Sequence, residues 1–135
     1  MTLFFALLGA RGARARAPHT AHARAAQKVK RMSAIKDQIA ALIAGHKAII
    51  FSKTTCPYCH AAKAAFKQVG VAPHVVELDG LADMGAWQDA LGALTGARSV
   101  PRVFVGGAFL GGGDDTAAAA RSGRLAELCK AAGLL

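Results

Sequence analysis

Two cysteines separated by two residues, Cys56 and Cys59, are the residues of this sequence whose types and spacing most clearly allow chemistry. They lie in the segment Thr54–His60, which reads TTCPYCH. The pattern fits three kinds of site: covalent haem attachment, one half of a zinc site, or a thiol–disulfide redox centre between a strand and a helix. The surrounding residues must decide among the three.

Haem and zinc both need partners that the sequence supplies poorly. A haem would need a distal axial ligand, for which Met84 is the candidate, and Pro57 between flanking strand and helix segments suits a haem loop badly. A structural zinc ion takes four protein ligands. Beyond the cysteine pair the chain offers only Cys129 and scattered histidines, with no second close pair.

The redox interpretation uses every residue of the segment. The apolar run Ala48–Ser52 predicts a buried strand, and a helix is expected from about Cys59 to Val69. Cys56 then lies at the N-terminal end of that helix, with Pro57 suited to its first turn. Free backbone N–H groups, the helix dipole and the positive charge of Lys53 all favour a thiolate there. Cys56 is therefore the expected nucleophile, and Cys59, one turn further on, the expected resolving thiol.

The remaining sequence predicts alternating helices and strands around this loop. The order is α-β-α-β-α-β-β-α, with a parallel crossover in the first half and a tight antiparallel pair in the second. An α/β fold with one mixed four-stranded sheet and helices on both faces satisfies both. The elements expected, besides those above, are a helix over Ser33–Gly45, a strand over His74–Leu78, a helix over Met84–Thr95, a hairpin of Arg102–Val105 and Ala108–Leu110 turning at Gly106-Gly107, a helix after GGGDD, and a last helix over Leu125–Ala132.

The charge of the chain is concentrated in residues 1–31, which hold seven Lys or Arg residues and no acidic residue. From Met32 onward ten basic residues face eight acidic ones, so this part carries only +2 of the formal +9. We expect residues 1–31 to form an extension without fixed structure that acts as a transit peptide for a mitochondrion or chloroplast. Residues 32–135 are expected to form the domain, and without such targeting the protein would be cytoplasmic.

Several classes of partner are disfavoured by composition. The basic residues are not clustered with aromatic side chains, so nucleic-acid binding is not expected. The apolar start MTLFFALLGA is shorter than the roughly 20 residues needed to span a bilayer. Three cysteines are too few for a secreted disulfide framework, which favours a reducing compartment.

Three segments in this order and spacing, KTTCPYC, RSVPRVFVGG and GGGDDT, resemble the dithiol glutaredoxins of the C-P-Y-C class. The resemblance covers Met32–Leu135. It implies a thioredoxin fold, a monomer, and glutathione as co-substrate and electron donor. It further implies a glutathione-dependent oxidoreductase that reduces glutathionylated proteins and protein disulfides. In such an enzyme Cys56 would be the nucleophile and Cys56 with Cys59 would form the redox-active disulfide.

The resemblance also places a glutathione groove on this sequence. Lys53 and Arg98 could hold the glycine carboxylate, and Val100, before an expected cis-Pro101, would pair with the backbone of the glutathione cysteine. Helix-start amides could take the γ-glutamyl carboxylate. The residues assigned to that end are Gly112, Gly113 and Asp114, while Tyr58 and Gln88 are expected to line the groove. At Gly113 the family usually has Cys or Ser, so one side-chain contact is expected to be missing.

Several other residues and functions have alternative interpretations. Asp115 is equally well a helix-terminus charge, and Cys129 and Trp87 fit core packing better than a functional role. An iron–sulfur carrier could hold a [2Fe–2S] cluster between two chains through Cys56 of each and two glutathiones. A thioredoxin-like enzyme reduced by a flavoprotein is disfavoured by the lack of a Trp just before Cys56. A zinc-binding interaction module is the last alternative.

Overall fold

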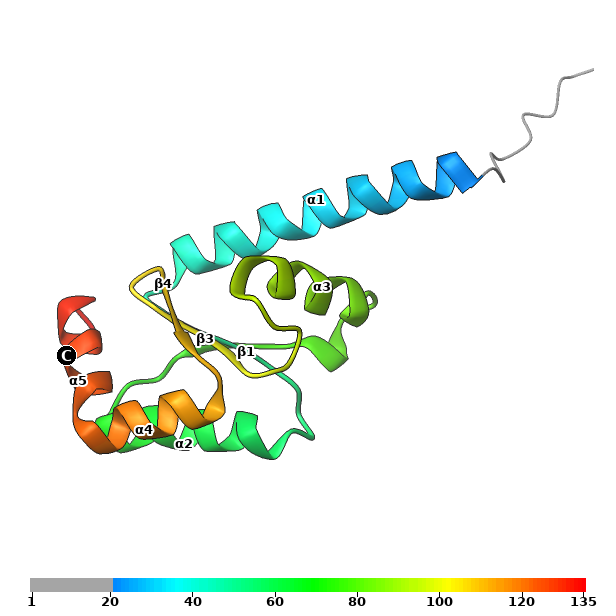
Figure 1. The fold of residues 1–135 in the computed structure, drawn as a ribbon. Coiled ribbons are helices and arrows are strands. Elements are labelled where there is room, and N and C mark those ends of the chain that lie inside the picture. Colours follow the sequence, from blue (N-terminus) through cyan, green and yellow to red (C-terminus); the bar gives the residue numbers. More distant parts are fainter. Residues whose placement is uncertain (1–20) are drawn as a thin grey trace, which may run out of the picture.

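The computed structural model describes residues 21–135, which form a four-stranded sheet between two layers of helices (Figure 1). The predicted transit peptide therefore lies mostly outside the described residues. The elements are α1 (Ala21–Gly45), β1 (Ala48–Ser52), α2 (Pro57–Val69), β2 (His74–Glu77), a 3₁₀ turn η1 (Leu78–Gly80), α3 (Met84–Thr95), β3 (Arg102–Val105), β4 (Ala108–Gly111), α4 (Gly113–Ser122) and α5 (Arg124–Ala131).

The sheet has the strand order β2-β1-β3-β4. β1 runs parallel to β2 and antiparallel to β3, and β3 pairs antiparallel with β4. The hairpin between β3 and β4 turns at Gly106 and Gly107, whose φ angles of 61° and 82° are those that a two-residue hairpin turn requires. The predicted α/β class and mixed sheet are confirmed.

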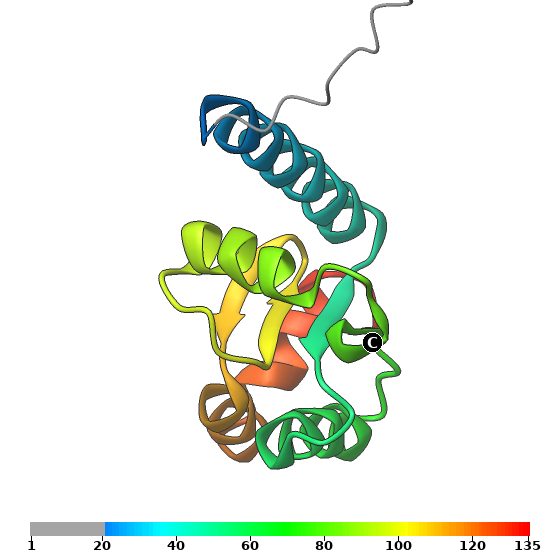
Figure 2. The same cartoon turned by 90° about the vertical axis from the view of Figure 1, so that its right-hand side faces the viewer.

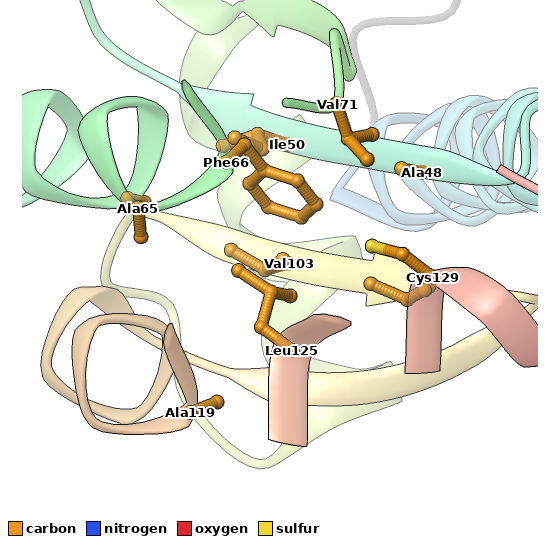
Figure 3. Packing of buried hydrophobic residues seen from close by; sticks show 11 residues of the cluster. Ala48, Ile50, Ala65, Phe66, Val71, Val103, Ala119, Leu125 and Cys129 are labelled. Atoms are coloured by element: carbon orange, nitrogen blue, oxygen red, sulfur yellow. The ribbon is translucent and has the colours of Figure 1, made fainter. Parts of the chain in front are cut away.

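Alternating side chains of the buried strands build one core on each face of the sheet. Ile49 and Phe51 of β1 point toward α1 and α3, where they meet Ile39 and Leu91. The core on the other face of the sheet contains Ala48 and Ile50 together with side chains of α2, α4 and α5. Figure 3 shows this second core, with Phe66, Val103 and Leu125 pointing into the same space. The two cores fix the edge of the sheet at which β1 ends and the cysteine loop begins.

Helix α1 begins 12 residues before the predicted helix start at Ser33. The sequence from Ala21 to Met32 has no Gly or Pro and is rich in Ala, Arg, Lys and Gln, which are good helix formers, so nothing stops the helix at Ser33. Residues 21–31, expected to lack fixed structure, are helical. Both buried residues of α1, Ile35 and Ile39, lie in its second half. The first half projects past the sheet (Figure 2).

Other element boundaries differ little from those predicted. α2 begins at Pro57 instead of Cys59, β2 ends at Glu77, and α5 covers Arg124–Ala131. The turn η1 after β2 was not predicted. Across residues 21–135 no helix combines the length and apolar character that crossing a bilayer would take.

Candidate active site at the cysteine loop

Cys56 is placed by the junction between strand β1 and helix α2. β1 is buried along its whole length and ends at Ser52, and Cys56 takes the N-cap position of α2 with φ −90° and ψ 118°. Pro57 follows at the first helical position, where a missing N–H costs nothing. A thiol at this position faces the unpaired N–H groups of the first helical turn, which favour negative charge.

The two thiols have unequal surroundings. Cys56 is partly exposed, whereas Cys59 is fully buried. The backbone N–H of Lys53 points at Cys59 Sγ over 3.5 Å. Burial raises the pKa of the Cys59 thiol above its usual value, against the lowering effect of this N–H and of the Ser52 hydroxyl. Both cysteines are free thiols. The Cys56 thiol is accessible, whereas the raised pKa of the buried Cys59 thiol keeps it protonated.

The loop before β3 faces the accessible thiol. The peptide bond between Val100 and Pro101 is cis, as predicted. The Cys56 thiol donates to the Val100 carbonyl oxygen at 3.7 Å. Arg102, only 9% exposed, donates from Nε to the Ser99 carbonyl and from a terminal nitrogen to the Ser99 hydroxyl, both at 2.6 Å. Arg102 thus stabilises the loop of Ser99 and Val100, which contacts Cys56.

A hollow of about 280 Å³ lies between this loop, the first turn of α2 and the start of α4. Six of the predicted groove residues line it together: Tyr58, Val100, Pro101, Gly112, Gly113 and Asp114. Ser99, Arg102 and Asp115 also line it and were not predicted as site residues. An arginine inside the otherwise apolar strand RVFV was a signal in the sequence that could have pointed to Arg102. No cysteine lines this hollow, but Val100, whose carbonyl oxygen accepts from the Cys56 thiol, is part of its wall. Larger hollows of about 520 and 500 Å³ lie elsewhere.

Three other predicted residues do not line this hollow. Gln88 donates from Nε2 to the Arg98 carbonyl oxygen at 3.3 Å, so it supports the chain that leads to the Val100 loop. The Arg98 side chain is paired with Asp89, its Nε lying 2.5 Å from a carboxylate oxygen. Lys53 lies on the cysteine loop and is partly buried. Arg98 would have to leave Asp89, or share it, to reach a ligand carboxylate.

Gly113 is buried against the first turn of α2. A Cβ built on it would lie 2.7 Å from the Tyr58 carbonyl oxygen and 3.0 Å from the Tyr58 Cβ, and real Cβ atoms do not approach backbone that closely. The space that a Cys or Ser side chain would occupy is therefore filled by the backbone of Tyr58. The glycine brings the start of α4 closer to the cysteine helix than any larger residue would allow.

The start of α4 can bind an anion. Asp115 accepts the Gly112 N–H at 3.1 Å and so stabilises the first turn, which agrees with its interpretation as a helix-terminus charge. The amides of the first turn have no partner within the helix, and they border the hollow. Asp114 is exposed beside them, so an ammonium and a carboxylate of one ligand could be held at this end.

Trp87 and Cys129 lie in the hydrophobic cores, as predicted. Trp87 is 8% exposed and packs in the core under α3, and Cys129 is fully buried in the core under α5 (Figure 3). Burial raises the pKa of the Cys129 thiol. Within residues 21–135 no three His, Cys, Asp or Glu side chains gather in a way that could hold a metal ion.

A mixed four-stranded sheet with helices on both faces, carrying an accessible thiol at a helix start and a second thiol buried one turn further along that helix, is typical of a thioredoxin-fold thiol–disulfide protein. Residues 48–110 match the family model described as glutaredoxin. Glutaredoxin-C4 of Arabidopsis thaliana is 47% identical over 97 residues, which cover 72% of each chain. The mitochondrial glutaredoxin-2 of Pongo abelii is 46% identical over 92 residues, or 68% of this chain, but the match spans only 57% of that relative.

Solved structures agree with these relatives. The crystal structure of oxidized glutaredoxin 2 from Chlamydomonas reinhardtii is 51% identical, with a TM-score of 0.75 over 77% of this chain and 98% of that one. A buckwheat glutaredoxin–glutathione complex is 34% identical, with a TM-score of 0.75 over 78% and 96% of the two chains. The chain belongs to the glutaredoxin family, whose members are thiol–disulfide oxidoreductases.

Proposed function

We propose that the protein is a glutathione-dependent oxidoreductase that removes glutathione from mixed disulfides and reduces protein disulfides. The observation that carries the proposal is the pair of unequal thiols, Cys56 accessible and Cys59 buried, with Cys56 in contact with Val100, which lines a hollow of about 280 Å³. The buckwheat relative is a complex with glutathione, which supports glutathione as the ligand of this hollow.

Deglutathionylation needs Cys56 alone. The Cys56 thiolate attacks the glutathione sulfur of a mixed disulfide, and the bond between that sulfur and the substrate sulfur breaks. The electron pair leaves on the substrate sulfur, which takes up a proton, and Cys56 is now bonded to glutathione. A second glutathione thiolate attacks the bound glutathione sulfur, which releases Cys56 as a thiolate and forms oxidised glutathione. A helix-start thiolate is a good leaving group for this step.

Reduction of a protein disulfide needs both cysteines. Cys56 attacks one sulfur of the substrate, and the other substrate sulfur leaves and is protonated. Cys59 then loses its proton and attacks Cys56 Sγ, so a Cys56–Cys59 disulfide forms as the bond to the substrate breaks. Two glutathione molecules reduce that disulfide. The full burial of Cys59, three residues after Cys56 on helix α2, supports this role and shields the thiol from external oxidants.

Glutathione would lie along the hollow with its central sulfur at Cys56. The Val100 backbone would pair with the cysteine residue of glutathione in the manner of an added strand. The first-turn amides of α4 would take the γ-glutamyl carboxylate, and Asp114 would take its ammonium. Lys53 and Arg98, the latter exchanging its contact with Asp89, would attract the glycine carboxylate from the other end.

The experiment that tests this function measures two activities in parallel. We expect Cys56→Ser to lose at least about 100-fold in both, because a serine hydroxyl is hardly ionised near neutral pH. Cys59→Ser should keep the reduction of a small glutathione mixed disulfide and lose most of the reduction of a protein disulfide. Equal loss of both activities in Cys59→Ser would contradict the assigned roles.

Cluster carriage is the alternative function, through a [2Fe–2S] cluster between two chains. The discriminating measurement is the visible absorbance of protein purified without oxygen, together with its mass in solution. A colourless, monomeric and active protein supports the oxidoreductase. A brown dimer that is inactive toward mixed disulfides would favour the carrier.

We also propose import into an organelle, since a mitochondrial relative is 46% identical and residues 1–31 are basic without acidic residues. A reporter fused to residues 1–31 should collect in a mitochondrion or chloroplast. A reporter spread evenly through the cytosol would overturn this proposal without touching the enzymatic one.

A further inference from the structure

Thr54, two residues before the nucleophile, is held by one carboxylate oxygen. Asp79 Oδ2 accepts the Thr54 backbone N–H at 3.1 Å and also accepts the Thr54 hydroxyl in a short hydrogen bond. The Thr54 carbonyl oxygen lies 3.0 Å from His60 Nε2 on α2, and the Nε2–H form of that histidine donates to it. Thr54 is thereby tied on one side to its own helix and on the other side to Asp79.

Asp79 is itself rigidly placed. It lies in the 3₁₀ turn η1 directly after β2, and its neighbour Leu78 is fully buried in the core under α3. The turn is closed by the Leu81 N–H, which donates to the Leu78 carbonyl oxygen at 3.0 Å. Since β1 and β2 are parallel neighbours, the loop after β1 and the turn after β2 meet at the same edge of the sheet. Asp79 therefore connects the nucleophile loop to the body of the sheet.

The same carboxylate faces the cation of the loop. The hydrogen bond from the Thr54 hydroxyl holds the pKa of Asp79 below its usual value, and the Thr54 N–H and the positive charge of Lys53 act in the same direction. Asp79 is thus ionised near neutral pH, and its negative charge lies beside the loop that carries both Lys53 and Cys56. Lys53 and Cys56 are further linked by the Cys56 N–H, which donates to the Lys53 carbonyl oxygen at 3.2 Å.

We propose that Asp79 is a positioning residue for the nucleophile: its carboxylate fixes Thr54, so that Cys56 and Lys53 are held in place, and its charge offsets part of the Lys53 charge. The inference rests on the proposed function, for which a fixed Cys56 matters because attack on a disulfide needs an aligned sulfur. Asp79 touches no reacting atom and acts through Thr54.

The ionisable groups around Cys56 must all be considered when its pH dependence is measured. On the loop, in the first turn of α2, on η1, at the start of α4, and from Arg98 to the start of β3, the described residues of this kind are Lys53, Tyr58, Cys59, His60, Asp79, Asp114, Asp115, Arg98 and Arg102. Asp79 differs from the other carboxylates in bonding directly to the loop that carries Cys56. The effect of a substitution at Asp79 can therefore be distinguished from the effect of removing a negative charge elsewhere near the site.

The test compares Asp79→Asn, which keeps an acceptor oxygen but loses the charge, with Asp79→Ala, which loses both. Asp83→Asn is the matched control, because it removes one carboxylate charge from the same loop but from a group paired with Arg31. Two quantities are measured: the pH dependence of Cys56 alkylation by iodoacetamide, followed by mass spectrometry, and kcat/KM for a small glutathione mixed disulfide. Circular dichroism and thermal unfolding show that each variant is folded.

We expect Asp79→Asn to move the alkylation midpoint to lower pH, which raises the rate below that midpoint about twofold, and to keep kcat/KM within about twofold. Asp79→Ala should lose about tenfold in kcat/KM, and Asp83→Asn should change neither quantity. If Asp79→Ala does not fold, Thr54→Val serves instead. It removes only the hydroxyl donor and should lower kcat/KM about threefold, with Thr54→Ser restoring it.

Full activity in Asp79→Ala, or in Thr54→Val where that replaces it, would overturn the positioning role. An alkylation midpoint that shifts equally in Asp83→Asn would overturn the specific charge effect. Alkylation needs no glutathione, so a wild-type protein that is inactive with glutathione would refute the proposed function while the pH dependence still tests Asp79.

Discussion

At the scale of single residues, the proposed mechanism gives different roles to two thiols that have unequal surroundings. Cys56 donates to the Val100 carbonyl from an accessible position, whereas Cys59 is fully buried. The raised pKa of Cys59 means that its proton must be removed before it can attack. The two branches of the reaction should therefore respond differently to pH.

The ratio of protein-disulfide reduction to mixed-disulfide reduction should rise as pH increases from about 6 to 8.5. Below its pKa the thiolate fraction of Cys59 grows tenfold per pH unit, and only the protein-disulfide branch uses that thiolate. The measurement is the rate at which reduced enzyme releases each reduced substrate in a single turnover without glutathione across this range, because the glutathione thiolate that completes both cycles also increases with pH. A ratio that stays constant with pH would mean that ionisation of Cys59 does not limit the dithiol branch.

Gly113 is a departure from its family that the structure explains by packing. We expect Gly113→Ser to raise KM for a glutathione mixed disulfide about threefold to tenfold, because its Cβ would push α4 away from Tyr58. Overpacking of this kind usually costs about 1–3 kcal/mol of unfolding free energy. Steady-state kinetics and urea unfolding check both effects.

The control for Gly113→Ser is Gly85→Ala, since a Cβ at Gly85 in helix α3 would meet nothing within 4 Å. That variant should keep its KM and lose no stability, because alanine is the better helix former. If Gly113→Ser also left KM and stability unchanged, the close contact between Gly113 and Tyr58 would contribute neither to glutathione binding nor to stability.

Some site residues could be predicted from the sequence and others could not, for a physical reason. The cysteines and the loop around Pro101 are recognisable because their chemistry is carried by adjacent residues. Asp79 was not predicted as a site residue because its contact with Thr54 spans 25 positions, and no local sequence pattern indicates that contact. The pairing of Arg98 with Asp89 was missed because an exposed arginine near a helix end gives no sign of its partner.

At the scale of elements, the accuracy of prediction followed the placement of helix-breaking residues. The bounds of α3 and β3 were predicted correctly because Gly96 and Gly106 end them. The start of α1 was wrong because Ala21–Met32 has no breaker and no buried residue to mark where packing begins. A serine that can cap a helix is also tolerated inside one when the preceding residues favour helix.

The two halves of α1 should therefore differ in their contribution to stability. We expect Ile39→Ala to lower the unfolding free energy by about 2–5 kcal/mol, because Ile39 is 1% exposed in the core under α3. Val29→Ala on the same helix should change it by less than about 0.5 kcal/mol, since Val29 is 68% exposed. Denaturant unfolding of both variants measures the difference, and equal losses would mean that the first half of α1 packs against the domain.

At the scale of the whole molecule, charge and catalysis are carried by different parts of the chain. Removing residues 1–31 takes away seven positive charges and leaves a formal charge of +2. Within residues 21–135, an exposed ion pair between Arg31 and Asp83 at 3.7 Å crosses this cut, and exposed pairs contribute at most about 1 kcal/mol.

A protein that starts at Met32 should keep kcat/KM within about twofold of the full chain and should leave a cation exchanger at lower salt. Kinetics and chromatography of the two proteins side by side test this. A large loss of activity on truncation would show that the basic helix takes part in catalysis.

The antiparallel placement of β3 beside β1 brings Val100 against Cys56, although the two are 44 positions apart in the sequence. A chain that has formed only its first βαβ unit therefore has its nucleophile but lacks the opposite wall of the site. Recovery of activity during refolding should lag behind formation of the first helices, since pairing distant strands is slow. For this protein, enzymatic activity measured during refolding would therefore report when β3 has paired with β1 and the sheet is complete.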